Sequence, residues 1–351
     1  MLYQTEYTHG GDIYSGKVLL DFSSNINPLG TPDRVLKAMR DAVDLAGHYP
    51  DPYCREAVKS ISTYENVPPE TILIGNGAAE LIYAYCFALQ PRKALIPVPA
   101  FLEYAAALQS AGCEICEYAL DRNKDFLPDE DFLRCIEETS PEVLFLCSPN
   151  NPTGQLIPPD YFARILDLCS RKKIRVLADE CFIDLSDSRY DFREQIGSHG
   201  ELLILKAFTK NFALPGIRIG YCLCSDEELL RKMSRMVQPW NVSVIAQAAA
   251  AAAVHETDYL EKARRLISTE RARMAKQFES LGFWVCQSHA NFLLFQAPVG
   301  LDDALRREGI AIRCCANYSG LGPGWYRTAV RKPEENQTLM EAVRRAVSGR
   351  N

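Results

Sequence analysis

The chain has 351 residues, of which 47% are hydrophobic and 24% charged, and its formal net charge is −6. This length allows one large domain and a smaller one, and the composition is that of an ordinary globular protein. The acidic balance, without basic clusters interleaved with aromatic residues, argues against nucleic-acid binding. No strongly apolar run reaches about 18 residues and the first residues do not resemble a signal peptide, so we expect no membrane insertion.

The 13 cysteines are scattered along the chain. One CxxC motif, Cys113 to Cys116, has no second motif at zinc spacing to complete it. We therefore expect no metal site. Reduced, mostly buried thiols are typical of a cytoplasmic protein.

The predicted elements begin with a helix after Pro32, with Leu36, Met39 and Val43 as its apolar stripe. Short apolar runs then alternate with helical segments such as 78–89 and 159–172. Runs that are hydrophobic almost throughout predict strands covered on both faces. The expected strands are 72–74, 94–98, 143–146, 175–178, 202–205 and 219–223. This alternation predicts an α/β fold with a mostly parallel sheet.

The character of the sequence changes after residue 282. Strand-like runs are expected at 291–296, 310–314 and 326–331, followed by a helix over 334–347. We predict a small α+β domain over residues 283–351, joined by the N-terminal segment and helix of residues 1–45. Residues 46–256 are expected to form the large domain, and 257–282 a linking helix.

Lys210 lies in the most informative segment, 207–220, where it follows Thr209 and precedes Arg218 by eight positions. A partly desolvated lysine loses its proton more easily and can attack a carbonyl group. A nearby arginine favours both a neutral amine and a bound dianion. This segment resembles the Schiff-base segment of fold-type I enzymes that use pyridoxal 5′-phosphate (PLP).

Other segments offer the remaining partners that PLP requires. Asp179 follows a predicted strand directly, and its carboxylate suits the ring nitrogen. Segment 74–80 is a glycine-rich turn that opens a helix, which suits a phosphate group. The candidate cofactor-binding residues are Gly77, Ala78, Ala79, Phe101, Asn151, Asp179, Thr209, Lys210 and Arg218, with Lys210 and Asp179 catalytic.

Together these segments resemble the class I and II aminotransferase family, and within it the histidinol-phosphate aminotransferase branch. The resemblance implies a fold-type I transferase fold with a large domain and a small α+β domain. It also implies a homodimer with shared active sites, in which Tyr49 reaches the cofactor phosphate of the other subunit.

Two features depart from the aminotransferases of this branch. Phe182 stands where these enzymes usually have tyrosine, and Arg331 stands where they usually have glycine. Arg327 matches the arginine that binds the substrate carboxylate in the family. Since Arg331 follows four residues later, we expect it in the same strand and on the same face, where it would bind a second anionic group.

The segment from His9 to Gly11 and the segment from Cys315 to Tyr318 resemble the threonine-phosphate decarboxylases. The resemblance implies decarboxylation of L-threonine O-3-phosphate to (R)-1-amino-2-propanol O-2-phosphate, a step of cobalamin synthesis. The implied substrate-binding residues are His9, Asn27, Asn151, Arg313, Arg327 and Arg331.

Three alternatives remain open at this point. The chain could be a histidinol-phosphate-type aminotransferase, against which Phe182 and Arg331 argue. It could decarboxylate L-serine O-phosphate, which lacks one methyl group, and a methyl group changes binding by only about 1–3 kcal/mol. A ligand sensor built on the PLP fold is the third alternative, against which Lys210, Asp179 and Arg327 argue.

Overall fold

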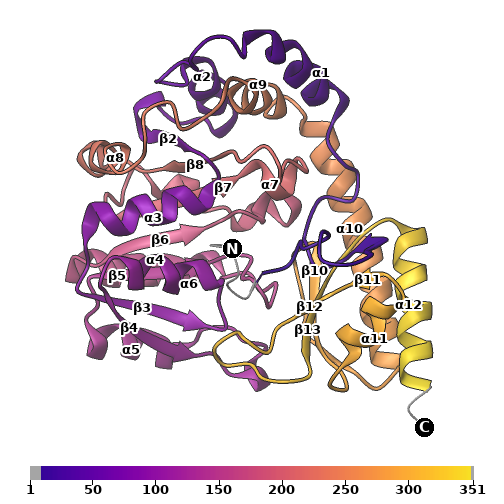
Figure 1. The fold of residues 1–351 in the computed structure, drawn as a ribbon. Coiled ribbons are helices and arrows are strands. Elements are labelled where there is room, and N and C mark those ends of the chain that lie inside the picture. The colour runs from indigo at the N-terminus through magenta and orange to yellow at the C-terminus, as the bar shows by residue number, and fades with distance from the viewer. Residues whose placement is uncertain (1–8, 349–351) are drawn as a thin grey trace.

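The computed structural model describes residues 9–348, arranged around two separate sheets of seven and four strands and a short β1–β11 pair (Figure 1). The large sheet has the order β2-β8-β7-β6-β5-β3-β4. Its strands are β2 (Ile72–Gly75), β3 (Lys93–Val98), β4 (Glu114–Ala119), β5 (Val143–Cys147), β6 (Arg175–Asp179), β7 (Leu202–Ala207) and β8 (Gly220–Leu223). Strand β8 is antiparallel to both neighbours and the other pairs are parallel, so the predicted mostly parallel sheet is confirmed.

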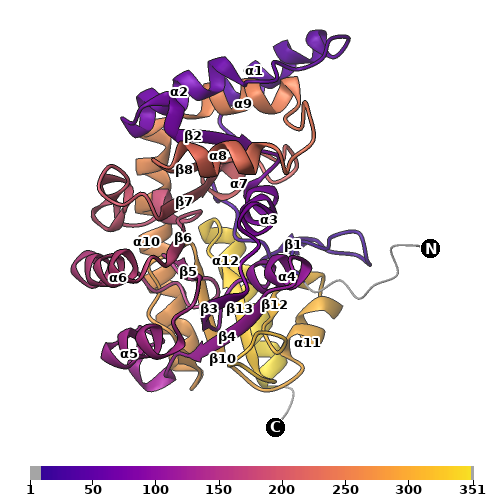
Figure 2. The ribbon, with the colours of Figure 1, turned by 90° about the vertical axis from the view of Figure 1, so that its left-hand side faces the viewer.

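Helices cover both faces of this sheet. Figure 2 shows α3 (Ala78–Leu89) and α4 (Leu102–Ser110) on one face, and α5 (Glu130–Thr139) and α6 (Pro159–Lys172) on the other. Strands β5 and β7 are buried at every residue, because apolar side chains on alternate sides enter two different cores. Strand β4 was not predicted, since it lies at the edge of the sheet and exposes part of its residues.

The small sheet is antiparallel and has the order β12-β13-β10-β9. It packs with α10 (Thr257–Ser280) and α12 (Pro333–Ser348), and α11 (Leu301–Arg307) lies beside it (Figure 1). Strand β1 (Leu20–Asp21) pairs in parallel with β11 (Ile310–Ala311) next to this sheet. The strands of the small sheet are β9 (Trp284–Val285), β10 (Phe292–Gln296), β12 (Arg313–Cys314) and β13 (Trp325–Ala329).

The first helix differs from its prediction. Helix α1 (Asp33–Ala42) packs against α9 (Val244–Ala253), at the end of the molecule remote from the small sheet (Figures 1 and 2). The expectation that this helix joins the small domain is therefore wrong. Its buried residues are Val35 and Ala42, and Met39 is half-buried against the same core, whereas Val43 is 53% exposed, so the predicted stripe is wrong at Val43. Residues 1–8 lie outside the described part of the chain.

The remaining elements are short or lie at the ends of the large sheet. They are α2 (Arg55–Glu65), α7 (Phe208–Asn211) and α8 (Glu227–Ser234), with 3₁₀ helices η1 (Val43–Leu45), η2 (Pro69–Thr71), η3 (Arg122–Lys124), η4 (Ile183–Leu185), η5 (Ser188–Tyr190) and η6 (Arg193–Gln195). The domain boundaries predicted from the sequence stay a prediction.

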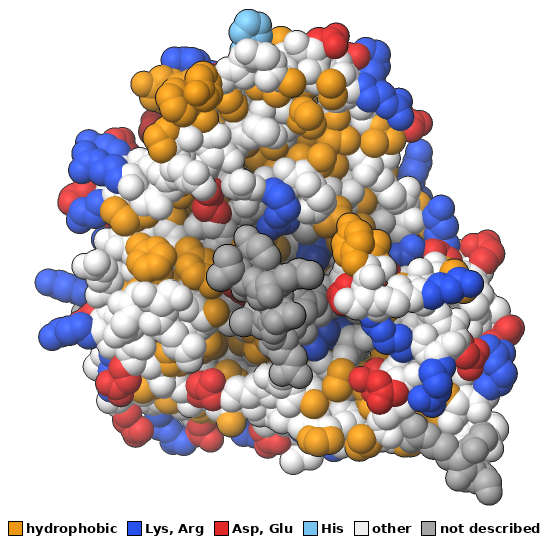
Figure 3. Space-filling view, in the orientation of Figure 1, with side chains coloured by type: hydrophobic (Ala, Val, Ile, Leu, Met, Phe, Trp, Pro, Cys, Tyr) orange, Lys and Arg blue, Asp and Glu red, His pale blue; other side chains and the backbone are white. Residues whose placement is uncertain are grey.

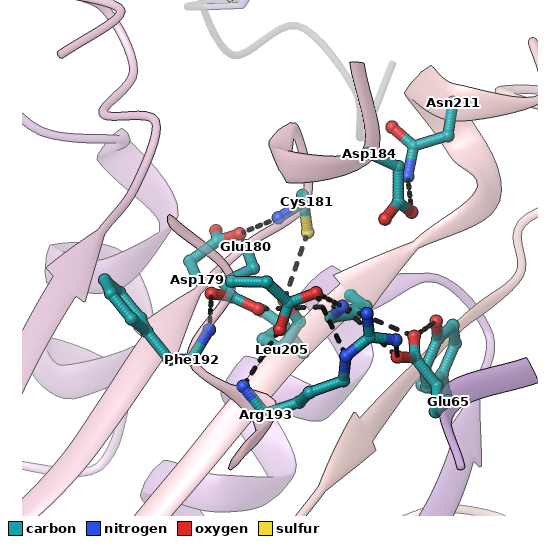
Figure 4. Close-up of polar contacts among 12 residues, drawn as sticks. Glu65, Asp179, Glu180, Cys181, Asp184, Phe192, Arg193, Leu205 and Asn211 are labelled. Carbon is teal, nitrogen blue, oxygen red and sulfur yellow. Dashed lines mark hydrogen bonds and ion pairs between the residues drawn. The ribbon is translucent and has the colours of Figure 1, made fainter. Parts of the chain in front are cut away.

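A buried ionic cluster lies beside the carboxyl ends of β6 and β7 (Figure 4). Lys206 is 1% exposed, and its Nζ lies 2.9 Å from Asp191, 3.3 Å from Glu65 and 3.6 Å from Glu180. Arg193 donates to Glu65 at 3.0 Å. Buried charges are tolerated only when they are paired in this way.

Acidic groups outnumber basic ones in this cluster, and Asp184 interacts electrostatically with it as a further acid. Burial is the main cause that raises the pKa of Asp184 to about 6, and burial also raises the pKa of Glu180 well above its usual value. The cluster therefore takes up protons readily, which lowers its excess negative charge.

We expect Lys206→Met to destabilise the protein by about 3–5 kcal/mol, because it leaves buried carboxylates without their cation. Denaturant unfolding at neutral pH measures this change. The exposed Lys37, which pairs with Asp41 on the same helix, provides the control, and Lys37→Met should change stability by less than about 1 kcal/mol. The deficit of Lys206→Met should shrink as pH falls, because protonated acids no longer require the cation. Equal unfolding midpoints for Lys206→Met and the unmodified chain would contradict the expectation.

Candidate active site

A cavity of about 750 Å³ lies where the carboxyl ends of the parallel strands face the small sheet. Open α/β sheets bind ligands at this edge. Of the residues predicted from the sequence, those that line the cavity are His9, Ala78, Ala79, Phe101, Asn151, Asp179, Thr209, Lys210, Arg218, Arg313 and Arg327.

Lys210 lies in the short helix α7, directly after β7, and its side chain lines the cavity. Burial is the main cause that lowers the pKa of its amine to about 8, and the charges of Arg327 and Arg218 act in the same direction. Its Nζ lies 6.0 Å from the centroid of the Phe182 ring. The amine is therefore neutral far more often near neutral pH than that of an ordinary lysine, which suits a nucleophilic lysine.

Asp179 is the last residue of β6 and is only 6% exposed. Its carboxylate accepts a hydrogen bond from the Tyr104 hydroxyl at 2.5 Å and one from the Cys181 N–H at 2.9 Å. Burial raises the pKa of Asp179 in spite of these hydrogen bonds. A cationic group placed against this carboxylate would favour its ionised form.

In the turn before α3, Gly77 lies against the guanidinium of Arg218. Gly77 has φ +84°, and a Cβ atom at this position would lie 2.6 Å from the Arg218 guanidinium, so glycine is required there. Ala78 and Ala79 form the first turn of α3, where backbone N–H groups have no partner within the helix. With Thr209 and Arg218 also lining the cavity, this corner suits a phosphate dianion.

Arg327 connects the small sheet with the large one. Its guanidinium donates to the side-chain oxygen of Asn151 and to the backbone oxygen of Ser23, the latter at 2.8 Å. The side chain is buried, and its Nε–H has no hydrogen-bond partner among the described residues. Arg327 is thus fixed in place while one donor of its planar fork remains unused.

Arg313 stands directly opposite Arg327 in the register of β12 and β13. Opposite residues of an antiparallel pair project to the same face, and both side chains line the cavity. The Arg313 guanidinium donates to the Asn317 side chain at 2.8 Å and lies 5.2 Å from the Tyr318 ring centroid. Two guanidinium groups on one face repel each other, so the arrangement favours bound anions.

Asn27 does not line the cavity, contrary to its predicted role in substrate binding. Its backbone N–H donates to the Lys210 carbonyl at 3.1 Å, and its side-chain amide donates to the Asn211 carbonyl at 2.8 Å. Asn27 therefore holds the turn that carries Lys210.

Arg331 also lies outside the cavity lining. Strand β13 ends at Ala329, so the expectation that Arg331 shares the strand and face of Arg327 is wrong. Its guanidinium donates to the Asp21 carbonyl at 3.1 Å and pairs with Glu335 at 2.8 Å. Arg331 instead joins the segment after β13 to β1 and α12.

Tyr49 is 79% exposed and stacks on Trp240, with ring centroids 4.5 Å apart. It does not line the cavity of its own chain. The role that the resemblance implies would require the cavity of a second subunit.

His9 lies at the cavity beside Phe101, with ring centroids 6.0 Å apart. Its Nε2 lies 2.7 Å from the Glu103 carboxylate, which also accepts a hydrogen bond from the Tyr83 hydroxyl at 3.2 Å. Glu103 therefore anchors His9 to helix α4.

The sequence reasoning missed several lining residues, namely Ser23, Glu103, Tyr104 and Tyr318. Tyr104 meets Asp179 from a helix 75 residues earlier in the chain, and no local pattern signals that contact. Tyr318 had a usable signal, because it stands in the segment that resembles the decarboxylases.

These residues fit PLP. The amine of Lys210, whose pKa is lowered, suits the aldehyde of PLP. The buried carboxylate of Asp179 suits a protonated ring nitrogen, and the turn at Gly77 suits the phosphate group. In contrast, residues 9–348 contain no cluster of three or more His, Cys, Asp or Glu side chains that could hold a metal ion. No helix in this part of the chain is long and apolar enough to span a membrane.

Comparisons with known proteins agree with this geometry. Residues 17–343 match the family described as aminotransferase class I and II. The threonine-phosphate decarboxylase of Salmonella typhimurium is 35% identical, with 97% of each chain covered. Histidinol-phosphate aminotransferase 1 of Cupriavidus pinatubonensis is 31% identical, covering 94% of this chain and 88% of that protein.

Two solved structures show the same fold. The histidinol-phosphate aminotransferase of Clostridium acetobutylicum has a TM-score of 0.88 at 34% identity, covering 94% of this chain and 100% of that one. The L-threonine-O-3-phosphate decarboxylase of Porphyromonas gingivalis has a TM-score of 0.85 at 22% identity, with coverage of 94% and 100%. The family match, the relatives and the site lead to one conclusion: the chain belongs to the aminotransferase class I and II family.

Proposed function

We propose that this protein is a PLP-dependent decarboxylase that converts L-threonine O-3-phosphate to (R)-1-amino-2-propanol O-2-phosphate and CO₂. The observation that carries the proposal is the pair of arginines, Arg313 and Arg327, which stand opposite each other and line the same cavity as Lys210. The substrate carries two anionic groups, a carboxylate and a phosphate, and the pair offers one guanidinium to each. The similarity to the Salmonella enzyme supports the same substrate.

When bound, PLP supplies an electron-withdrawing ring that stabilises the carbanion left at Cα after CO₂ departs. The chain does the rest. Lys210 would hold the cofactor through its amine, and in its protonated form it would be available to return a proton to Cα. Asp179 would favour the protonated form of the ring nitrogen. Arg327 holds the carboxylate, while Arg313 and His9 hold the phosphate.

Phe182 supports decarboxylation over amino transfer. Its ring is 5% exposed, lines the cavity and packs edge-on against Phe292, with centroids 5.1 Å apart. A phenylalanine supplies no hydroxyl where the aminotransferases of the related branch usually have a tyrosine. The phenolic oxygen of PLP would therefore have one hydrogen-bond donor fewer than in those aminotransferases.

The second candidate is a histidinol-phosphate-type aminotransferase, which the solved structure at 34% identity favours. Such an enzyme binds glutamate, whose two carboxylates also make two anionic groups. The arginine pair alone therefore does not distinguish decarboxylation from amino transfer. Only the aminotransferase requires a 2-oxo acid, and this requirement distinguishes the two reactions.

The decisive experiment incubates PLP-loaded protein with L-threonine O-3-phosphate in the absence of any 2-oxo acid. Equimolar CO₂ and aminopropanol phosphate are expected, with L-serine O-phosphate assayed in parallel. Glutamate formed only after 2-oxoglutarate and histidinol phosphate are added, with no CO₂, would establish the aminotransferase instead.

The arginines should differ in their effect on substrate binding. We expect Arg313→Gln and Arg327→Gln each to raise KM about 10- to 100-fold, because each loses a charge-assisted contact of about 1.5–3 kcal/mol. Arg331→Gln is the matched control and should change KM by less than about 3-fold, since Arg331 pairs with Glu335 outside the cavity. A larger KM effect for Arg331→Gln than for Arg313→Gln would reverse the assignment.

The capture of PLP should depend on pH through Lys210. Only the neutral amine attacks the aldehyde, so the rate of covalent attachment to PLP-free protein should rise with pH through about 8 and level off above it. Two pH units below that pKa, the rate should be on the order of 100-fold lower. Stopped-flow absorbance measures it, with Lys210→Ala as the variant that attaches no PLP. A rate independent of pH would show that another group is the nucleophile.

We also propose a homodimer, located in the cytoplasm. Figure 3 shows hydrophobic side chains gathered over the upper part of the molecule, where α1, α2 and α9 lie. Exposed apolar residues of this region include Tyr49 and Tyr53, which are 79% and 69% exposed. All 13 cysteines are free thiols, which suits a reducing compartment.

Light scattering should give a mass of about twice the 39.4 kDa chain. Tyr49→Ala should weaken retention of PLP while Lys210 still attaches it. A monomer that is fully active at all concentrations would exclude shared active sites.

A further inference from the structure

Arg122 makes an unusual contact across the two sheets. It lies on η3, which follows β4 of the large sheet, yet its guanidinium carbon is 4.7 Å from the Trp284 ring centroid and 5.3 Å from that of Trp325. Its Nη1 donates to the Gln296 side chain at 2.9 Å. All three partners belong to the small sheet. We call this group of four residues the Arg122–tryptophan contact.

The loop that carries Arg122 has a backbone suited to this contact. Asp125 and Phe126 have φ values of +52° and +57°, a left-handed conformation that is rare for a bulky residue. Phe126 is 3% exposed and packs edge-on against both tryptophans, with centroids 6.1 Å and 5.8 Å away. A rare backbone conformation persists only where surrounding contacts determine it; here they include hydrogen bonds within the loop and the packing of Phe126 against the two tryptophans of the small sheet.

The contact lies on the face of the small sheet that carries the arginines. Trp325 and Arg327 are alternate residues of β13, so their side chains project to the same face. Gln296 and Leu294 of β10 stand opposite them in register. The small sheet meets the large-sheet side at several points, among them Arg122 near one end, Asn151 through Arg327, and Phe182 against Phe292 of β10.

The region between these points reaches the cavity wall. Tyr318 packs in one apolar cluster with Phe126 and Trp325, and it also lines the cavity beside Arg313. A change in how Trp325 sits against Arg122 is thus transmitted to both arginines, through two residues of strand and through Tyr318. Lys210, Asp179 and Arg218 do not lie on this path, because they belong to the large-sheet side, whereas Asn151 meets it through Arg327.

We propose that Arg122 is a positioning residue for the anion-binding arginines. The Arg122–tryptophan contact fixes the small sheet against the large one, and so sets the distance of Arg313 and Arg327 from Lys210. The Arg122 guanidinium resists movement of the small sheet along this face, because it contacts two indole rings and donates a hydrogen bond to the Gln296 amide. The role in substrate binding rests on the proposed function, whereas the role in placing the small sheet does not.

The first test uses steady-state kinetics of the PLP-loaded enzyme. Arg122→Gln is expected to raise KM for L-threonine O-3-phosphate about 10-fold or more, with kcat reduced less and covalently attached PLP unchanged. Arg122→Lys keeps the cation but not the planar guanidinium, so its KM should fall between those of the unmodified enzyme and Arg122→Gln. Arg134→Gln is the control, because Arg134 is an exposed arginine paired with Asp131 on the same helix. If Arg122→Gln lowers only thermal stability and leaves KM unchanged, the proposal is wrong.

The second test does not require turnover. Trp284 and Trp325 are two of the three tryptophans, so a Trp240→Phe background reports on the contact alone. In that background, binding of inorganic phosphate to PLP-loaded protein is followed by tryptophan emission. We expect Arg122→Gln to weaken phosphate binding about 10-fold and to shift the emission, whereas Arg134→Gln changes neither. Unchanged phosphate affinity and emission would overturn the proposal, and absence of CO₂ release by the unmodified enzyme would count against the proposed function only.

Discussion

Burial at the carboxyl edge of the large sheet acts on two groups of opposite charge, and the site depends on it. It lowers the proton affinity of Lys210 and raises that of Asp179, so both side chains are driven towards their neutral forms. For the lysine this is the state that reacts with a carbonyl group. For the aspartate it is a penalty that a cationic ring nitrogen would offset. A single cause therefore prepares one residue for reaction and makes the other selective for a positively charged partner.

The supporting contacts keep these groups in place without filling the cavity. Asn27 donates hydrogen bonds to the carbonyls of Lys210 and Asn211. The Tyr104 hydroxyl donates a hydrogen bond to the Asp179 carboxylate. Gly77 lets Arg218 lie against the start of α3. The buried ionic cluster at Lys206 fixes the neighbouring ends of β6 and β7. Asn27 restrains the backbone beside Lys210 and Tyr104 restrains the side chain of Asp179, so these groups have few alternative positions.

The parts of the structure that follow from local pattern were predictable from sequence. Strands β3, β5, β6 and β7 are buried on both faces, and their continuous apolar runs show it directly. Lys210 and Asp179 follow such strands, so their place at the carboxyl edge could be predicted with them. Helices 78–89 and 159–172 coincide with α3 and α6.

The errors arose where spacing was extended beyond a local element. Arg331 was placed by counting four residues along a strand, but β13 ends at Ala329, where the chain bonds to Phe22. Helix α1 was assigned to the small domain because of its neighbours in sequence, whereas in space it packs on α9. The contacts of Tyr104 with Asp179 and of Arg122 with two tryptophans join segments far apart in the chain, and only the folded topology brings them together.

Strand β8 has a consequence for how such a site can change over time. Because β8 runs back against β7, Lys210 and Arg218 both lie in the connection between Ala207 and Gly220, with Arg218 just before β8. Lys210 and Arg218 are therefore parts of one β7–β8 connection, while Arg313 and Arg327 stand on a different sheet. Under the proposed function, substitutions in β12 and β13 would alter substrate binding and leave the segment that carries Lys210 and Arg218 unchanged, so the substrate could change separately from the reactive centre.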